Sequence, residues 1–146
     1  MLTPRCQGPV VKVHDVSAVL TFHAQGKPMS HPVVWFEVLG KDAQKLQGFY
    51  AEAFGWSIKK SPGPMEYGEV AAADRGIPGG IGAAGGPFPS GVRFYISTDD
   101  CEKTLARAEK LGGKRLVPPT TLPDGMQIAL LSDPEGYVVG LVQRQS

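Results

Sequence analysis

Hydrophobic residues recur along this chain with two periods, one typical of strands and one typical of helices. Residues 32–39 (PVVWFEVL) alternate between two faces, which predicts a strand whose two sides have different surroundings. Residues 43–54 carry apolar side chains at i, i+3, i+4 and i+7, which predicts an amphipathic helix. Asp42 is a suitable N-cap for this helix, and Gly55 is suited to end it in a left-handed conformation.

The same order of elements occurs a second time. After the first helix, strand-like runs occupy residues 56–60, 65–73 and 79–84. A glycine- and proline-rich segment at 85–91 then separates the two sets. The second set has, in chain order, a strand at 92–98, a helix at 101–111, a strand at 114–117, a loop at 118–125, and strands at 126–132 and 137–143.

Matching residues in the two sets support a duplication. Asp42 and Asp100, the two expected helix caps, are 58 positions apart (100 − 42), and Gly55 and Gly113 have the same offset (113 − 55). A period near half the chain indicates two copies of one β-α-β-β-β unit, neither of which can bury a sheet face alone. We therefore predict an α+β fold, with a curved mixed sheet of roughly eight strands, a concave cup and both helices outside. Both glycines are expected to have positive φ.

The duplicated pattern does not extend to the N-terminal part of the chain. We expect residues 1–30 to be an N-terminal extension and residues 31–146 to form one domain. Within that domain, module one is expected at 32–84, the linker at 85–91 and module two at 92–143.

Composition excludes several classes of partner. The net charge is +1, so no overall field favours nucleic acid or an anionic membrane surface. No apolar run approaches the ~20 residues that a membrane span needs. Cys6 and Cys101 have neither metal-site spacing nor a disulfide framework, which agrees with free thiols in a reducing compartment. We expect a cytoplasmic protein, and a homodimer because exposed strand edges need cover.

The stretch at 132–143 (SDPEGYVVGLVQ) combines a tight turn with a strand that Gly140 interrupts. Together with the duplication, with the WFEV and FGW runs near Trp35 and Trp56, and with GGI at 79–81, it resembles the vicinal oxygen chelate superfamily. That superfamily includes glyoxalase I, bleomycin-resistance proteins and extradiol dioxygenases. The resemblance covers residues 32–143 and implies a ligand site in the cup.

The resemblance also implies where a metal would be bound, because relatives use one position on the first and last strand of each module. In this chain those positions hold Trp35 (42 − 7), Arg93 (100 − 7), Ile81 (74 + 7) and Gly140 (133 + 7). None of these side chains ligates a divalent ion as His, Glu or Gln does. We therefore expect no metal and no cofactor. The three histidines are expected to be solvated or satisfied in the core; they are His14, His23 and His31.

Strand parity predicts what fills the cup instead. The residues expected to contact a ligand there are Trp35, Glu37, Ile81, Arg93, Tyr95, Gln127 and Gly140. Aromatic rings supply flat apolar surface and a guanidinium suits an anionic group, while a glycine opens volume. Pairing of Arg93 with Glu37 is the alternative, since a buried charge needs a partner.

Three functions remain open at this point. The first is a metal-free small-molecule-binding protein of the bleomycin-resistance type, with an aromatic or amphipathic ligand. The second is a glyoxalase-like lyase or isomerase, acting with Glu37 as base or with a divalent metal at an unrecognised site. The third is a structural or regulatory module whose cup is filled by its own side chains.

Overall fold

The computed structural model describes residues 31–143. Module one contains β1 (Val33–Gly40), α2 (Ala43–Phe54), β2 (Ile58–Lys60), β3 (Tyr67–Val70) and β4 (Gly79–Ala83). Module two contains β5 (Gly91–Ser97), α3 (Cys101–Lys110), β6 (Lys114–Thr121), β7 (Gln127–Ser132) and β8 (Val138–Gln143). The predicted β-α-β-β-β order is confirmed in both modules. The expected extension at 1–30 lies outside the described residues.

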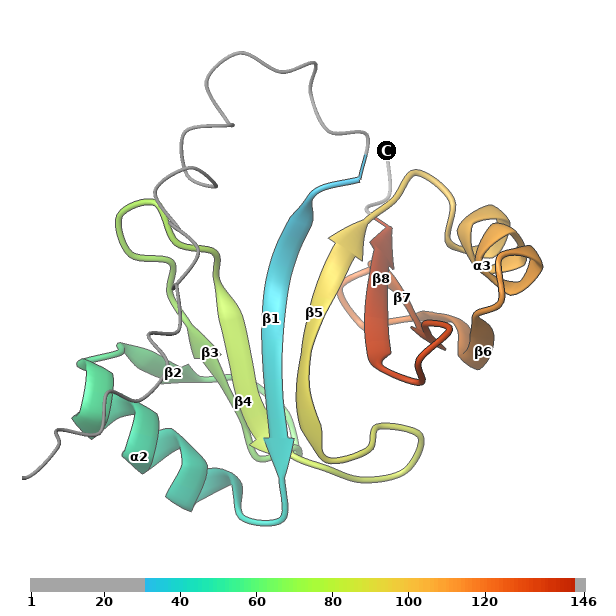
Figure 1. The fold of residues 1–146 in the computed structure, drawn as a ribbon. Helices are drawn as coiled ribbons and strands as arrows, with labels where there is room; N and C mark the ends of the chain where they lie inside the picture. Colours follow the sequence, from blue (N-terminus) through green and yellow to red (C-terminus); the bar gives the residue numbers. More distant parts are fainter. Residues whose placement is uncertain (1–30, 144–146) are drawn as a thin grey trace, which may run out of the picture.

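The eight strands form one sheet in the order β2-β3-β4-β1-β5-β8-β7-β6. The first strands of the two modules lie side by side at its centre, antiparallel, with Phe36 opposite Phe94. Each first strand pairs in parallel with the last strand of its own module. Figure 1 shows α2 and α3 on the outer side of the two halves, with β1 and β5 between them. The predicted curved mixed sheet with outer helices is confirmed.

Each helix begins at the aspartate expected from the sequence. The carboxylates of Asp42 and Asp100 accept hydrogen bonds from the backbone N–H groups of Lys45 and Lys103, both at 2.9 Å. Such caps satisfy one of the free donors at a helix N-terminus and contribute about 1 kcal/mol each. The aspartate is therefore repeated in the two modules because it caps the helix in each of them.

The two helices end differently. Gly55 ends α2 with φ of 67°, as predicted. Gly113 does not have positive φ; the left-handed residue after α3 is Gly112, with φ of 96°. A Cβ on Gly113 would lie 2.8 Å from the carbonyl oxygen of Ser132, so this glycine is needed for close backbone approach. The prediction of a positive φ at Gly113 was therefore wrong.

Strand β6 is longer than its sequence predicts. It continues through Pro118 and Pro119 to Thr121, where a loop was expected. Among the strands of residues 31–143, β6 lies at the edge of the sheet and pairs with β7 alone, with two irregularities in register. An edge strand tolerates proline because one side of its backbone makes no ladder hydrogen bonds.

Two apolar clusters fill the space between the sheet and the helices. One joins Val38, Val70 and Ile81 to residues of α2 and the following loop, and the other joins Cys101 and Leu105 to β7 and β8. Cys101 is a free, buried thiol. A third cluster lies on the opposite face and includes Tyr95, Val117 and Leu130, with Trp35 against it; its members belong to the concave face, here called the cup. None of the helices within residues 31–143 has the length and apolar content needed to cross a bilayer.

Candidate functional site

The centre of the cup lies where β1 and β5 pair. Trp35 is directly opposite Tyr95, and Glu37 is directly opposite Arg93. Cross-strand partners point to the same side of a sheet, so all four side chains share the concave face. The structure therefore brings together four of the seven residues expected to line the cup.

Glu37 is the acceptor at the middle of this group. Tyr95 donates its hydroxyl hydrogen to Oε2 of Glu37 at 2.9 Å, and Tyr67 donates to Oε1 at 3.2 Å. Trp35 in turn donates its indole N–H to the hydroxyl oxygen of Tyr67 at 3.2 Å. The chain of donors runs from Trp35 through Tyr67 to the carboxylate, so Glu37 holds three side chains from three strands in place.

Arg93 neutralises this carboxylate without bonding to it closely. Its Nε lies 3.6 Å from Oε2 of Glu37, which is an ion-pair distance but too long for a hydrogen bond. Nη2 of Arg93 donates to the carbonyl oxygen of Pro89 in the linker. Both charged residues are buried, with 8% of Glu37 and 4% of Arg93 exposed. The predicted alternative, pairing of Arg93 with Glu37, is present in the structure.

Burial raises the pKa values of Glu37 and of the two tyrosines that bond to it. Desolvation raises the pKa of the Glu37 carboxyl above its ordinary value, against the opposing effects of the Tyr95 hydrogen bond and the Arg93 charge. Desolvation, followed by the charge of Glu37, also raises the pKa values of the Tyr67 and Tyr95 phenols. Both phenols therefore stay protonated at neutral pH and act as hydrogen-bond donors.

Two of the expected cup residues lie on the other side of the sheet. Ile81 is opposite Val38 and packs in the cluster beneath α2, and its register neighbour Gly80 is opposite Glu37. Gln127 shares its face with Ala129, which is buried beneath α3. Counting residues from a turn assigns a side chain to the wrong face of the sheet when the turns of the two modules differ in length by one residue, because a slip of one residue reverses the face of every side chain in the strand.

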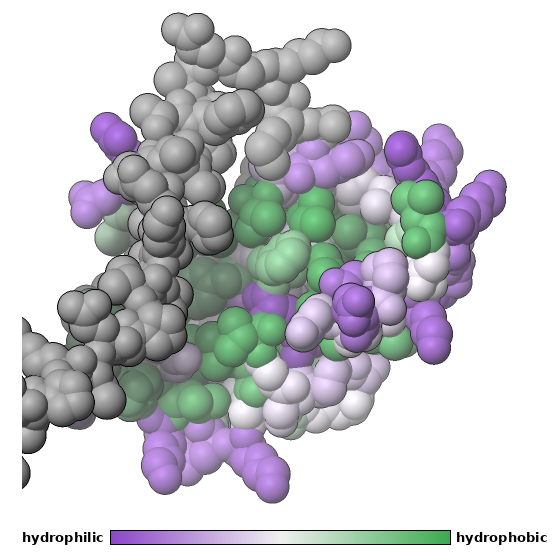
Figure 2. All heavy atoms as spheres, in the orientation of Figure 1, coloured by the Kyte–Doolittle hydropathy of each residue, from purple (hydrophilic) through white to green (hydrophobic). Residues whose placement is uncertain are grey.

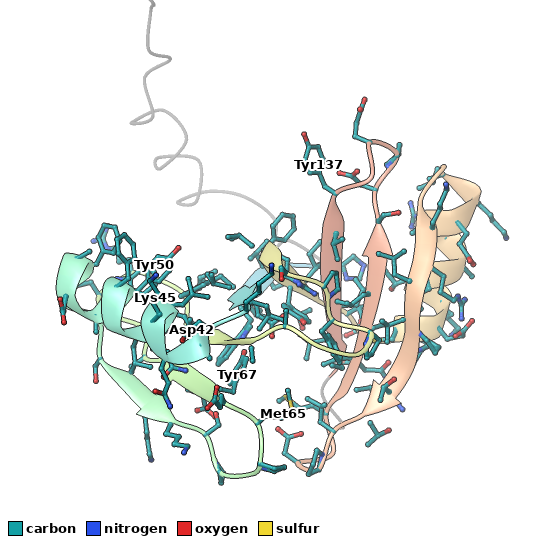
Figure 3. All side chains as sticks on the ribbon, turned by 90° about the horizontal axis from the view of Figure 1, so that it is seen from below. Asp42, Lys45, Tyr50, Met65, Tyr67 and Tyr137 are labelled. Atoms are coloured by element: carbon teal, nitrogen blue, oxygen red, sulfur yellow. The ribbon has the colours of Figure 1, made fainter. Side chains whose placement is uncertain are left out.

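Glycines occupy the last-strand positions that face the cup, and tyrosine rings fill the space above them. A Cβ on Gly140 would lie 2.2 Å from Cδ1 of Tyr95, and a Cβ on Gly80 would overlap the hydroxyl group of Tyr67. Gly140 was expected to leave open volume in the cup; instead, the ring of Tyr95 occupies that space. Figure 3 shows Tyr67 extending from β3 toward the interior between the modules.

Sequence reasoning missed Tyr67 as a member of this site. A signal was present, because the fourth strand reads GGIGA and glycines inside a strand indicate close approach of another group. The close group is the ring of Tyr67, which lies against both Gly80 and Gly82. His31 lies outside the site, where it is exposed and its Nδ1 is 3.2 Å from the carbonyl oxygen of Ser97. His14 and His23 are outside the described residues.

The side chains present do not fit the metal site of the superfamily. Of the cup-facing positions, two hold Trp35 and Arg93 and two hold glycines whose Cβ space the tyrosine rings occupy. Glu37 is the carboxylate at the centre, and both of its oxygens already accept phenol hydrogens. Within residues 31–143 there is no group of three or more His, Cys, Asp or Glu side chains that would hold a metal ion.

A hollow of about 290 Å³ lies beside this network, in the module-one half. Its lining residues are Trp35, Ser57, Lys59, Glu69, Val70, Ala71 and Pro78. Because the indole N–H is bonded to Tyr67, the part of Trp35 left for contact in this hollow is carbon surface. A second hollow, of about 330 Å³, lies at the start of α2 near Asp42 and Lys45 and includes none of the cup residues.

Comparison with curated proteins finds relatives with longer chains. A protein named putative glyoxylase CFP32 from Mycobacterium tuberculosis (strain CDC 1551 / Oshkosh) is 27% identical over 117 residues, and a protein of the same name from Mycobacterium bovis matches equally. The match covers 75% of this chain and 44% of each relative, so the chain spans less than half their length.

Solved structures with the same fold are more distant in sequence. A glyoxalase/bleomycin resistance protein/dioxygenase superfamily member from Vibrio splendidus 12B01 has a TM-score of 0.57 at 19% identity, covering 78% of this chain and 99% of that one. Methylmalonyl-CoA epimerase from Mycobacterium tuberculosis has a TM-score of 0.62 at 10% identity, covering 84% and 95%. At these identities the likeness shows the vicinal oxygen chelate fold.

The sequence also matches the model of a protein family, described as the Glyoxalase-like domain, over residues 35–142. That range covers nearly all of both modules and every residue of the Glu37 network. The chain therefore belongs to the Glyoxalase-like domain family.

Proposed function

We propose that this protein binds a small planar or amphipathic molecule in the cup and does so without a metal ion. The observation that carries the proposal is the hollow beside Trp35, whose lining combines this indole with three aliphatic and three polar residues. Aromatic walls with a few polar groups at their edge are typical of small-molecule sites. Here the polar residues are Ser57, Lys59 and Glu69, which suit a ligand with an apolar body and a polar end.

The buried network gives this wall its rigidity. Trp35 is held by Tyr67, and Tyr67 by Glu37, so the indole has a defined orientation before a ligand arrives. A preorganised wall loses little side-chain entropy on binding, which favours affinity. Binding without a metal is proposed because the cup positions at which relatives bind a metal hold an indole, a guanidinium and two glycines, none of which is a metal ligand.

The proposal is tested by a thermal-shift screen of planar aromatic compounds, followed by calorimetry of those that raise the melting temperature. A ligand at 100 times its Kd stabilises the native state by about 2.7 kcal/mol. Trp35→Ala should weaken binding by about 1–3 kcal/mol, the usual scale for a central aromatic contact. Trp56→Phe is the matched control, because Trp56 packs on the α2 side of the sheet. EDTA should leave the affinity unchanged.

Two results would contradict this proposal. Loss of binding in EDTA, restored by one divalent metal, would show that the ligand needs an ion. Failure of every compound to shift the melting temperature would favour the alternative that the cup is filled by its own side chains, as the tyrosine rings over Gly80 and Gly140 already do at its centre.

Acid–base catalysis by Glu37 is a second candidate function. It is favoured by the burial of this carboxyl, which raises its pKa toward the range in which a general base works near neutral pH. A glyoxalase-like lyase or isomerase using such a base should exchange a carbon-bound hydrogen of a carbonyl substrate. The test is proton NMR in D₂O: exchange that the wild type catalyses and Glu37→Gln does not would support catalysis.

The expected homodimer is a separate proposal. On the helix-facing side of β5, Val92 is 71% exposed and Phe94 is 44% exposed. Figure 2 shows hydrophobic residues gathered toward the middle of the face seen in Figure 1. A second copy of the chain would bury this surface by twofold symmetry. Light scattering should give twice the chain mass, and Phe94→Glu should return it to the mass of one chain.

A further inference from the structure

The guanidinium of Arg93 is enclosed and has too few acceptors. Its side chain is 2% exposed. Nη2 donates to the carbonyl oxygen of Pro89, but among the described residues Nη1 and Nε have no hydrogen-bond partner. A buried donor without an acceptor costs about 1–3 kcal/mol, and more when the group is charged. An acceptor of matching charge would remove that cost.

Residues 31–143 do not supply that acceptor. Glu37 is the carboxylate within ion-pair distance, but Oε2 accepts from Tyr95 at 2.9 Å and Oε1 accepts from Tyr67. Nε of Arg93 remains 3.6 Å from Oε2, and Nη1 has no hydrogen-bond partner in the part of the chain that the structure describes. The two tyrosines thus take the oxygens with which an arginine would ordinarily form a close pair, and Nε and Nη1 are left as buried donors on the concave face.

We propose that Arg93 is the anchoring subsite for the carboxylate of a monoanionic organic acid, and that this carboxylate is taken up together with one proton, which Glu37 receives. The inference rests on the proposed small-molecule function and names the class of ligand. Arg93 shares the concave face with Trp35 but lines neither hollow, so the carboxylate must open room beside the guanidinium when it binds. A monoanion matches the charge, since Arg93 and Glu37 are neutral as a pair and one added negative charge is cancelled by one proton. A dianion such as a phosphate monoester would leave uncompensated charge in a buried place.

The direction of the pH effect follows from the groups around Glu37. Arg93 and Tyr95 face it from β5, and Tyr67 faces it from β3, with Glu69 farther along that strand. The adjoining position of β4 is Gly80, which has no charge. Arg93 is therefore the neighbouring positive charge, and an anion bound to it weakens its hold on an ionised Glu37. Burial already favours the protonated carboxyl. Carboxylate affinity should therefore fall as pH rises.

The experiment compares acids with their amides on the full chain by calorimetry. The probes are benzoate and benzamide, phenylacetate and phenylacetamide, and indole-3-acetate and indole-3-acetamide, measured between pH 5.5 and 8. In the wild type, the acid of a binding pair should bind about 10- to 100-fold more tightly than its amide at pH 5.5. The Kd of the acid should rise up to about tenfold per pH unit, with proton uptake seen as a buffer-dependent heat. The Kd of the amide should not change with pH.

Variants assign these effects to residues. Arg93→Met should remove the preference for the acid, whereas Arg115→Met should keep it, because Arg115 pairs with Glu102 and Glu109 on the outer surface. Glu37→Gln should bind the acid with a Kd that no longer depends on pH. The wild-type acid and amide data need no variant, so they remain decisive if Arg93→Met does not fold.

Each outcome has a distinct meaning. Acid and amide binding with equal affinity at every pH would overturn the Arg93 subsite while leaving small-molecule binding intact. A preference for the acid that survives in a folded Arg93→Met would also overturn it. Absence of binding by all six probes and by the wider aromatic screen would overturn the proposed function and, with it, the subsite.

Discussion

A methyl group added at Gly140 should strongly destabilise the fold. In Gly140→Ala, the new Cβ would lie 2.2 Å from Cδ1, 2.4 Å from Cε1 and 2.5 Å from Cγ of Tyr95. Carbon atoms in contact prefer about 3.5–4.0 Å, so the ring must move by more than an ångström. Tyr95 is buried and bonded to Glu37, so that movement also breaks the 2.9 Å hydrogen bond.

The size of the effect can be worked out from these two losses. Overpacking of a core costs about 1–3 kcal/mol. Removing a hydrogen bond to a charged group costs about 1.5–3 kcal/mol. Together they predict a loss of about 2.5–6 kcal/mol, a large part of the 5–15 kcal/mol by which a domain is ordinarily stable.

Urea unfolding followed by circular dichroism measures this loss as a lower midpoint at an unchanged slope. Gly85→Ala is the matched control, because its Cβ would meet nothing within 4 Å. In a Tyr95→Leu background, Gly140→Ala should cost much less, which a double-mutant cycle detects as coupling. If Gly140→Ala alone remains within about 0.5 kcal/mol of the wild type, the argument that this glycine exists to admit the tyrosine ring is wrong.

Three further predictions concern the titration of the site, the helix ends and the N-terminal segment. Burial raises the pKa of Glu37 above its ordinary 4.5, so its contribution to stability is complete below pH 4.5 and is lost as pH rises through the pKa of the folded state. The difference in unfolding free energy between the wild type and Glu37→Gln, measured by urea titration, should therefore increase as pH falls; a decrease would contradict this. Gly55→Val should lower the unfolding free energy by about 1 kcal/mol or more, because φ is 67° there, and an unchanged melting curve would count against it. A chain lacking residues 1–29 should unfold cooperatively in calorimetry, since the duplicated pattern begins at β1; an insoluble product would show that the boundary is misplaced.

Sequence alone determined the elements that depend on local chemistry. Asp42 and Asp100 cap the two helices, and Gly55 ends the first of them, because a short side-chain acceptor and a residue without Cβ are needed there whatever surrounds them. The repeat offset of 58 then indicated the module order, whereas the pairing of β1 with β5 at the centre of the sheet came from the structure. Alternation along these two strands placed Trp35, Glu37, Arg93 and Tyr95 on one face correctly, because side chains of a regular strand have a period of two.

Tertiary structure decided what pattern counting could not. Ile81 was expected in the cup and lies beneath α2, because turn length sets register and a slip of one residue reverses the face. Tyr67 joins the network from a strand that pairs with β4, a contact that depends on distant parts of the chain. The meaning of Gly140 changed for the same reason. A glycine in a strand indicates that something approaches closely, but only the packed sheet shows that it is the ring of Tyr95, held there by the buried carboxylate of Glu37.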